Sequence, residues 1–295
     1  MSKWCGVGLL VLFVCFPRIS SRGISSGLET GLLVLMPSIF PYMVVSQVAM
    51  KTGGIHLFCR MFQKNQKLKP ILELLIPSLF CGYPTGARLA SNAYNKNKIT
   101  KFQLYQMFGF GNIPGFGFTV SYVGGVLYQS VWLGLQIYLS FLFASLILMG
   151  ISCAMIKQEE TGLFSQEKER FLSFPSALVE SVTESSLTMV SLICFVCFFS
   201  SLISYLQSFL QDGPLCSVLC AILEITAGLP LLSKFFPLPF VIFFTAFSGL
   251  CVIFQSIFFD KTNAVNLLYL LILRSIYGIT CVLCFFGMGY LFGQF

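Results

Sequence analysis

The sequence predicts an all-α integral membrane protein, built from two inverted-topology repeats that contain broken or re-entrant helices. Hydrophobic residues make up 56% of the chain and charged residues 10%, whereas a soluble domain carries about 25% charged residues. Apolar runs near the roughly 20 residues that a spanning helix needs recur along the chain. Several of these runs contain glycine and proline, which free backbone groups that lipid cannot satisfy.

The apolar runs predict helices, because transmembrane strands would give alternating segments of about 10 residues. The first run follows Lys3, and no small-residue cleavage site comes after it. We therefore interpret it as a short first span, with a cleaved signal peptide as the alternative. We expect apolar segments at residues 4–17, 32–50, 71–92, 104–127, 131–156, 178–210, 214–233, 238–258 and 264–292.

One long polar stretch, Lys157–Ser173, lies between the fifth and sixth apolar segments and predicts a solvated linker between two halves. The predicted domains are then an N-terminal span and loop (1–25), a first repeat (26–156), a polar cytoplasmic linker (157–175) and a second repeat (176–295).

Two segments differ from ordinary spans. One contains Cys81-Gly82-Tyr83-Pro84-Thr85-Gly86-Ala87-Arg88, and the other contains Glu224-Ile225-Thr226-Ala227-Gly228-Leu229-Pro230. Irregular backbone at membrane depth is tolerated only where it is buried in protein or lines a wet cavity. We therefore predict a re-entrant hairpin or a broken helix at each, with a kinked spanning helix as the alternative.

The distribution of basic residues supports two hairpins. Basic loops favour the cytoplasm, and the loops on both sides of the first interruption are basic, so this segment should enter and leave on one side. With the N-terminus inside, three basic residues lie outside (Arg18, Arg22 and Lys234) and Arg274 lies within a span. The cytoplasmic set is Lys3, Lys51, Arg60, Lys64, Lys67, Lys69, Arg88, Lys96, Lys98, Lys101, Lys157, Lys168, Arg170 and Lys261.

This topology repeats. Each half is predicted to contain a span, a hairpin and two further spans, and the two hairpins open to opposite sides. Phe110-Gly111-Asn112 in the first half is echoed by Phe247-Ser248-Gly249 in the second. Inverted repeats with broken helices that meet at mid-membrane are typical of secondary transporters.

Three stretches resemble motifs of one family. Residues 81–88 resemble GYPxGA[KR], residues 223–228 are similar to LExTxG, and residues 248–255 resemble GGLSVHxQ, with Cys251 and Ile253 in place of a polar pair. These motifs belong to the sporulation integral membrane protein YlbJ family, in the Gate-domain (nucleoside-recognition) group, which is related to concentrative nucleoside transporters. The resemblance implies a role in endospore formation, movement of the small anion dipicolinate, and a place in the cell membrane or a forespore membrane.

Arg274 and Glu224 are the charged candidates for a binding site, since intramembrane ionisable residues are functional hypotheses by default. Arg274 lies about 11 residues from Asn263, roughly 16 Å deep. It could bind a substrate anion, form an ion pair with Glu224, or reach an interface through helix tilt. Glu224 could bind a coupling cation, relay a proton, or cap a half-helix.

Polar and glycine residues near the interruptions complete the candidate site. The glycines could let the amides of a half-helix face an anion, while Arg88 could instead anchor the cytoplasmic face and Asn112 could hydrogen-bond substrate. Asn112, Pro114 and Gly115 are predicted to break the apolar segment at 104–127. Glycines of the 109–117 stretch could instead serve helix packing. The predicted substrate-binding residues are Gly82, Tyr83, Thr85, Gly86, Arg88, Asn112, Glu224, Thr226, Gly228, Gln255 and Arg274.

The sequence contains no HExxH, Walker or GxGxxG motif, and its single histidine is His56. The CxxC pairs 194/197 and 281/284 lie in apolar runs, so we expect no metal site and no cofactor. The expected partners are the lipid bilayer, a small anion and a coupling cation or proton, and no nucleic acid. The alternative functions are a non-transporting scaffold of a sporulation complex and a carrier of nucleosides or other small solutes.

Overall fold

The structure is a computed structural model and describes residues 2–59, 69–83, 85–155, 171–260, 262 and 264–291. Over these residues, helices are the only regular secondary structure. Most of the predicted linker (157–170), the basic residues Arg60, Lys64, Lys67 and Lys261, and Pro84 lie outside the described residues. The helices are α1 (Ser2–Cys15), α2 (Pro17–Glu29), η1 (Thr30–Leu35), α3 (Met36–Lys51), α4 (Gly54–Cys59), α5 (Lys69–Cys81), α6 (Thr85–Asn95), α7 (Lys101–Gln106), η3 (Met107–Gly111), η4 (Gly117–Leu127), α8 (Val131–Met155), α9 (Phe174–Leu210), α10 (Pro214–Leu223), α11 (Ile225–Phe235), α12 (Leu238–Phe247), α13 (Gly249–Phe259) and α14 (Leu267–Leu291).

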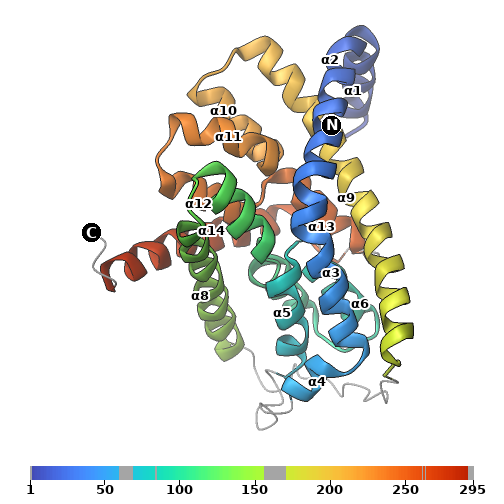
Figure 1. The fold of residues 1–295 in the computed structure, drawn as a ribbon. Helices are drawn as coiled ribbons and strands as arrows, with labels where there is room; N and C mark the ends of the chain where they lie inside the picture. The colour runs from blue at the N-terminus through green and yellow to red at the C-terminus, as the bar shows by residue number, and fades with distance from the viewer. Residues whose placement is uncertain are drawn as a thin grey trace.

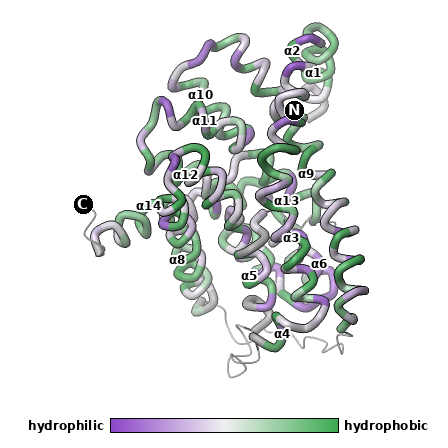
Figure 2. The backbone as a smooth tube through the Cα atoms, in the orientation of Figure 1, coloured by the Kyte–Doolittle hydropathy of each residue, from purple (hydrophilic) through white to green (hydrophobic). Residues whose placement is uncertain are grey.

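Among the described residues, five helical stretches are long and apolar enough to cross a bilayer: 17–51, 131–152, 174–210, 238–259 and 267–290. Figure 2 shows apolar colour along the outer helices α8 and α9. Many large apolar side chains of these helices are exposed, among them Leu187 and Val190 of α9. Lipid can cover such surfaces, and the chain is a multi-pass α-helical membrane protein.

The N-terminal region differs from the prediction of a first span, a loop and a second span. Residues 17–51 form one helical stretch of 35 residues through α2, η1 and α3. The prediction of a loop at 18–25 was wrong, because the glycine face of this polar segment packs against another helix. Helix α1 has 14 residues, fewer than the roughly 20 that span a bilayer.

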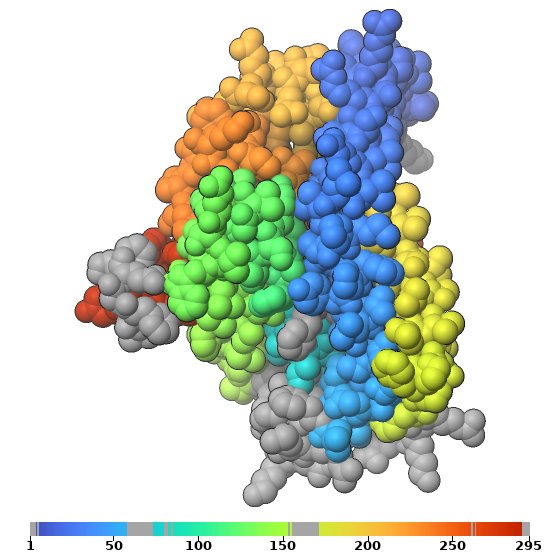
Figure 3. Space-filling view, viewed as in Figure 1, coloured from blue at the N-terminus to red at the C-terminus, as the bar shows by residue number. Residues whose placement is uncertain are grey.

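Helix α2 packs along α9 through glycines spaced four residues apart. An added Cβ would lie 2.4 Å from Ser201 Cα at Gly23 and 2.6 Å from Cys197 Cα at Gly27. Small residues at this spacing let two backbones approach closely. The N-terminal segment and α9 therefore run side by side along the molecule (Figure 3).

The two predicted interruptions are real breaks between short helices. Helix α5 ends at Cys81 and α6 begins at Thr85, whereas α10 ends at Leu223 and α11 begins at Ile225. The members of each pair pack against one another, which a kinked continuous helix could not do. The α5–α6 pair lies in the lower half of Figure 1, near α4, and the α10–α11 pair lies in the upper half.

Two further breaks divide apolar segments. The first separates η3 from η4 at residues 112–115, as the residues Asn112, Pro114 and Gly115 predict. The second separates α12 from α13 at Ser248, which has a left-handed φ of 78°, followed by Gly249 with φ 70°. The predicted apolar segment at 238–258 is present, but the sequence did not predict this turn, because Ser-Gly in an apolar run is also compatible with a continuous helix.

Candidate functional site

The four helix breaks contact one another inside the molecule. At the first break, the Tyr83 amide donates to the Ile113 carbonyl of the second break at 3.1 Å. Gly82 has φ 71°, and a Cβ there would lie 2.3 Å from the Gly115 amide nitrogen. Only glycine allows both this conformation and this approach, so the first two breaks are held backbone to backbone.

The breaks of the second half meet in the same way. A Cβ on Gly249 would lie 3.0 Å from the Ala221 carbonyl oxygen and 3.4 Å from the Ile225 amide nitrogen, so the Ser248 break lies against the Glu224 break. Asn112 donates to Ser256 of α13 at 3.0 Å, which links the two halves. We call the region where residues 82–83, 112–115, 224 and 248 meet the central site.

Arg274 fastens two of the breaks together. It is 2% exposed and lies in the first third of α14. Its Nη1 donates to the carbonyls of Asn112 (2.7 Å) and Gly109 (3.3 Å), and its Nε donates to that of Phe247 (3.3 Å). These carbonyls end η3 and α12, where the helix dipole is negative and a cation is favourable.

In the described part of the chain Arg274 has no carboxylate partner, so the predicted alternative of an ion pair with Glu224 was wrong. Two of its nitrogens are occupied by backbone carbonyls, while Nη2 has no hydrogen-bond partner. The Tyr277 ring lies beneath the guanidinium, 5.4 Å away. One donor group of Arg274 is therefore available to a ligand, rather than the two-nitrogen face that the sequence suggests.

Glu224 caps the N-terminus of α11. Its carboxylate accepts hydrogen bonds from the amides of Thr226 (3.0 Å) and Ala227 (2.6 Å), and it is 1% exposed. This is the capping alternative considered above, with the negative side chain at the positive end of the helix. The Thr226 carbonyl in turn accepts from the Tyr122 hydroxyl at 3.2 Å.

Unpartnered polar atoms gather around this centre. Besides Arg274 Nη2, the Tyr83 hydroxyl, Thr85 Oγ1, Asn112 Oδ1 and Gln255 Oε1 are buried without a hydrogen-bond partner. Buried polar groups are nearly always satisfied in native proteins, and each exception calls for an explanation. A polar ligand at the central site would supply the missing partners.

Gly86 and Gly228 lie at close approaches of the half-helices. A Cβ on Gly86 would lie 2.8 Å from Ser78 Oγ and 3.1 Å from Asn112 Oδ1. A Cβ on Gly228 would lie 2.5 Å from Ala221 Cα of α10. Gly86 therefore borders the unpartnered Asn112 oxygen, whereas Gly228 serves the packing of α10 on α11.

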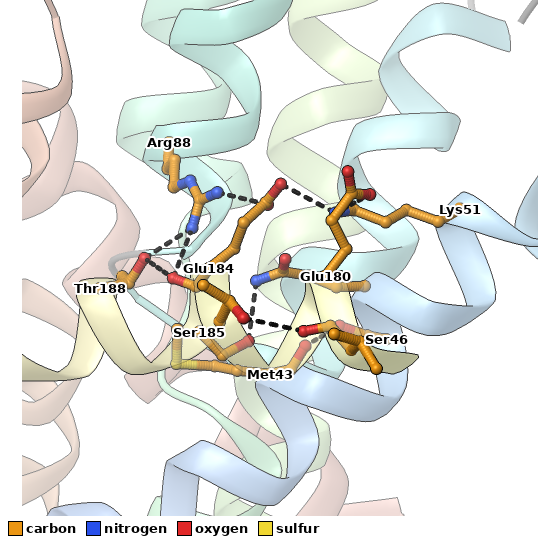
Figure 4. A network of polar contacts seen from close by, with 11 residues as sticks. Met43, Ser46, Lys51, Arg88, Glu180, Glu184, Ser185 and Thr188 are labelled. Atoms are coloured by element: carbon orange, nitrogen blue, oxygen red, sulfur yellow. Dashed lines mark hydrogen bonds and ion pairs between the residues drawn. The ribbon is translucent and has the colours of Figure 1, made fainter. Parts of the chain in front are cut away.

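Arg88 is the predicted site residue that is engaged away from this centre. Its Nη2 donates to Glu184 Oε2 of α9, and its Nη1 donates to Thr188 Oγ1, both at 2.6 Å. Lys51 joins the same Glu184 carboxylate from α3 (Figure 4). Arg88 therefore ties α6 to α9.

Sequence reasoning missed Ser248, Tyr122 and Glu184. Ser248 had a signal, since it lies in the stretch that echoes Phe110-Gly111-Asn112, where a break was predicted. The sequence also contains a signal for Glu180 and Glu184, because they lie one turn apart in an otherwise apolar segment, where unpaired acids are costly. Tyr122 had none, because its partner is a backbone carbonyl.

The fold and the central site define a class, a multi-pass α-helical membrane protein with interrupted helices around a buried polar centre. No group of histidine, cysteine or acidic residues that could hold a metal ion occurs in the described residues. No protein-family model, curated protein or solved structure matches the chain.

Proposed function

We propose that this protein is a membrane transporter of a small anionic metabolite, and that the solute binds at the central site. The observation that carries the proposal is the meeting of four helix breaks around buried polar atoms without partners. Each unsatisfied buried polar group costs about 1–3 kcal/mol. A protein that needed only to span the bilayer could avoid this cost with continuous helices.

The order of elements supports two inverted repeats. A long helical stretch, a broken pair, a second broken pair and a long helix follow one another in residues 17–155 and again in residues 174–291. The α5–α6 and α10–α11 pairs lie toward opposite ends of the molecule (Figure 1). We propose that both pairs are re-entrant, one from each side of the membrane, as in transporters that bind solute at the interface of two repeats.

Charge at the first break favours an anionic solute. Residues 82–88 contain no acid, so the positive end of α6 is not neutralised by a side chain of its own break. Thr85 is the first residue of this helix, and its hydroxyl has no hydrogen-bond partner. The Tyr83 hydroxyl and Arg274 Nη2 are further donors without a partner. Carboxylates accept charge-assisted hydrogen bonds from such groups.

The resemblance of residues 81–88 and 223–228 to the YlbJ family extends the proposal. On that basis we propose dipicolinate as the solute, endospore formation as the process, and the cell membrane or a forespore membrane as the location. Glu224 binds two amides with its carboxylate, so we assign it to the architecture of the site and not to a coupling cation or proton.

A non-transporting scaffold is the second candidate. The observation that favours it is that the buried charges Arg274 and Glu224 already bind backbone groups. A scaffold would use these charges only to hold the breaks together. It would have no use for the unpartnered atoms of Tyr83, Thr85 and Gln255.

Uptake into proteoliposomes tests the function. We expect the protein to take up labelled dipicolinate in preference to uridine, and Gly86→Leu to abolish uptake because its side chain would reach the Asn112 oxygen. Gly150→Leu on α8 is the matched control, since a Cβ at Gly150 meets nothing within 4 Å. Absence of dipicolinate uptake by the unmodified protein would leave the scaffold, and uridine uptake alone would favour a nucleoside carrier.

Side-specific labelling tests the inverted repeats. Single cysteines at Asn95 and Gly213, in a chain without other reactive thiols, should react from the cytoplasm and from the outside, respectively. Reaction of both from one side would refute the inverted arrangement.

A further inference from the structure

Four charged side chains from three helices form a connected network (Figure 4). Glu184 of α9 lies at its centre: one carboxylate oxygen binds Lys51 of α3 at 2.8 Å, and the other binds Arg88 of α6 at 2.6 Å. Glu180 binds only Lys51, also at 2.8 Å. The carboxylate of Glu184 is therefore held at two points by two cations from different helices.

A pocket of about 80 Å³ adjoins this network. It extends from the charged residues to Thr85, which begins α6 beside the first break. Its lining includes Lys51, Arg88, Glu184, Gln47, Thr85 and Asn92. We call this the access pocket.

Two atoms at the access pocket lack partners although they are buried. Thr85 is 1% exposed and its Oγ1 has no hydrogen-bond partner, and Gln47 is 5% exposed with an unpartnered Oε1. The other end of the Gln47 amide donates to Ser185 at 3.0 Å, which fixes its orientation. The pocket thus combines two cations with a free hydroxyl and a free carbonyl.

We propose that the access pocket binds the carboxylate of a small anionic solute, and that this carboxylate replaces Glu184 on Arg88. Glu184 already shows how such a group would bind, because it is itself a carboxylate and its two oxygens bind the cations Lys51 and Arg88. Guanidinium groups bind carboxylates with two nitrogens, and Arg88 already uses both of its terminal nitrogens toward α9.

The exchange is physically accessible. The side chain of Glu184 is 37% exposed, so it can move into solvent when it leaves Arg88. Ion pairs between partly exposed groups contribute little to stability, because water screens them and ordering long side chains costs entropy. After exchange, Lys51 retains Glu180 and the solute faces Thr85, the residue through which the pocket adjoins the central site.

This inference rests on the proposed function only in its direction, from the access pocket toward the central site. Binding of a carboxylate is independent of transport and can be measured on the purified protein in detergent. Acetate is the probe, with chloride and neutral acetamide at equal concentration as controls. The readout is the dissociation constant of acetate, obtained by fitting the rise in unfolding temperature to the logarithmic dependence on acetate concentration that binding to the folded state predicts.

Two substitutions with the same change in charge make the test sharp. Glu184→Gln removes the competing carboxylate, which acts from a short tether at an effective concentration of about millimolar or more. We expect Glu184→Gln to bind acetate at least about tenfold more tightly than the unmodified protein. Glu180→Gln leaves Glu184 on Arg88, and its acetate affinity should stay within about twofold.

Arg88→Gln combined with Glu184→Gln should abolish the gain. An equal gain in Glu180→Gln would mean diffuse electrostatic attraction and would overturn the proposal, as would no gain in Glu184→Gln or a gain equally produced by chloride. If Glu184→Gln does not fold, Glu184→Asp shortens the competing side chain and should tighten acetate binding by a smaller factor. Acetate binding as expected, in a protein that takes up no dipicolinate, would refute dipicolinate transport and leave the anion site.

Discussion

The two broken pairs solve the same physical problem with different residues. Between α10 and α11, Glu224 supplies a carboxylate that caps the amides of the second half-helix. Between α5 and α6, the break includes Gly82 and Tyr83, and α6 begins at Thr85, whose hydroxyl has no partner among the described residues. One break carries its own negative charge and the other carries none.

This difference separates architecture from binding. A capped helix N-terminus has little left to offer an external anion, because its first amides are satisfied. A helix N-terminus without an acid at its break remains attractive to an anion. We therefore expect the α10–α11 break to be more important for stability and the α5–α6 break to be more important for solute binding.

The largest effect is expected at Arg274. Its hydrogen bonds go to neither the α5–α6 break nor the α10–α11 break, but to carbonyls at the breaks that follow η3 and α12. Arg274→Gln would leave carbonyls of Gly109, Asn112 and Phe247 without donors, at about 1–3 kcal/mol each before relaxation. We predict a fall in stability of about 3 kcal/mol or more, measured by thermal unfolding in detergent.

Adding Glu224→Gln to Arg274→Gln sharpens the comparison. Because Glu224 binds amides of its own break and not Arg274, the second substitution should lower stability further. Recovery of stability in the double variant would show that the two charges depend on each other, and would contradict the view that the Glu224 break is independent of Arg274.

Gly82→Ala should have the next largest effect. Alanine at φ 71° is strained, and its Cβ would lie 2.3 Å from the Gly115 nitrogen, a backbone atom that cannot move aside. Strain of about 1–3 kcal/mol is expected, read from abundance in the membrane and unfolding temperature. Gly150→Ala, in open space on α8, should match the unmodified protein, and equal behaviour of the two variants would mean that the first break is not tightly packed.

Glu224→Ala should lower stability by about 2 kcal/mol, the upper range for loss of a helix cap. Thr85→Ala, at the first residue of α6 in the other pair, should change stability by less than about 0.5 kcal/mol, because the hydroxyl has no partner to lose. Thermal unfolding of both variants compares the two breaks directly. A Thr85→Ala loss as large as that of Glu224→Ala would contradict the division of roles.

The sequence predicts the breaks well where proline or glycine accompanies polar residues, as at 82–86 and 112–115. It does not predict the Ser248 break, because Ser-Gly in an apolar run is equally compatible with a continuous helix. The helical course of residues 17–25 was also missed, since the match of Gly23 and Gly27 to α9 is a property of two distant segments.

The candidate site was predicted in its composition more than in its contacts. Arg274 and Glu224 are conspicuous as charges in apolar segments, but their partners are backbone carbonyls and amides, which leave no trace in the sequence. The role of Arg88 depends on Glu184, almost one hundred residues away. Such pairings follow from the tertiary fold and not from local pattern.

The central claim is that the α5–α6 break binds the solute, and a matched pair of threonines tests it most directly. Thr85 offers a free hydroxyl at the first break, whereas Thr226 lies at the Glu224 break, where both its amide and its hydroxyl bind the Glu224 carboxylate, so its hydroxyl is not free for a ligand. We predict that Thr85→Val lowers initial dipicolinate uptake into proteoliposomes about tenfold or more, the loss expected from one hydrogen bond to a charged ligand, while Thr226→Val keeps most of it. Equal uptake by the two variants, or a greater loss in Thr226→Val, would contradict the account.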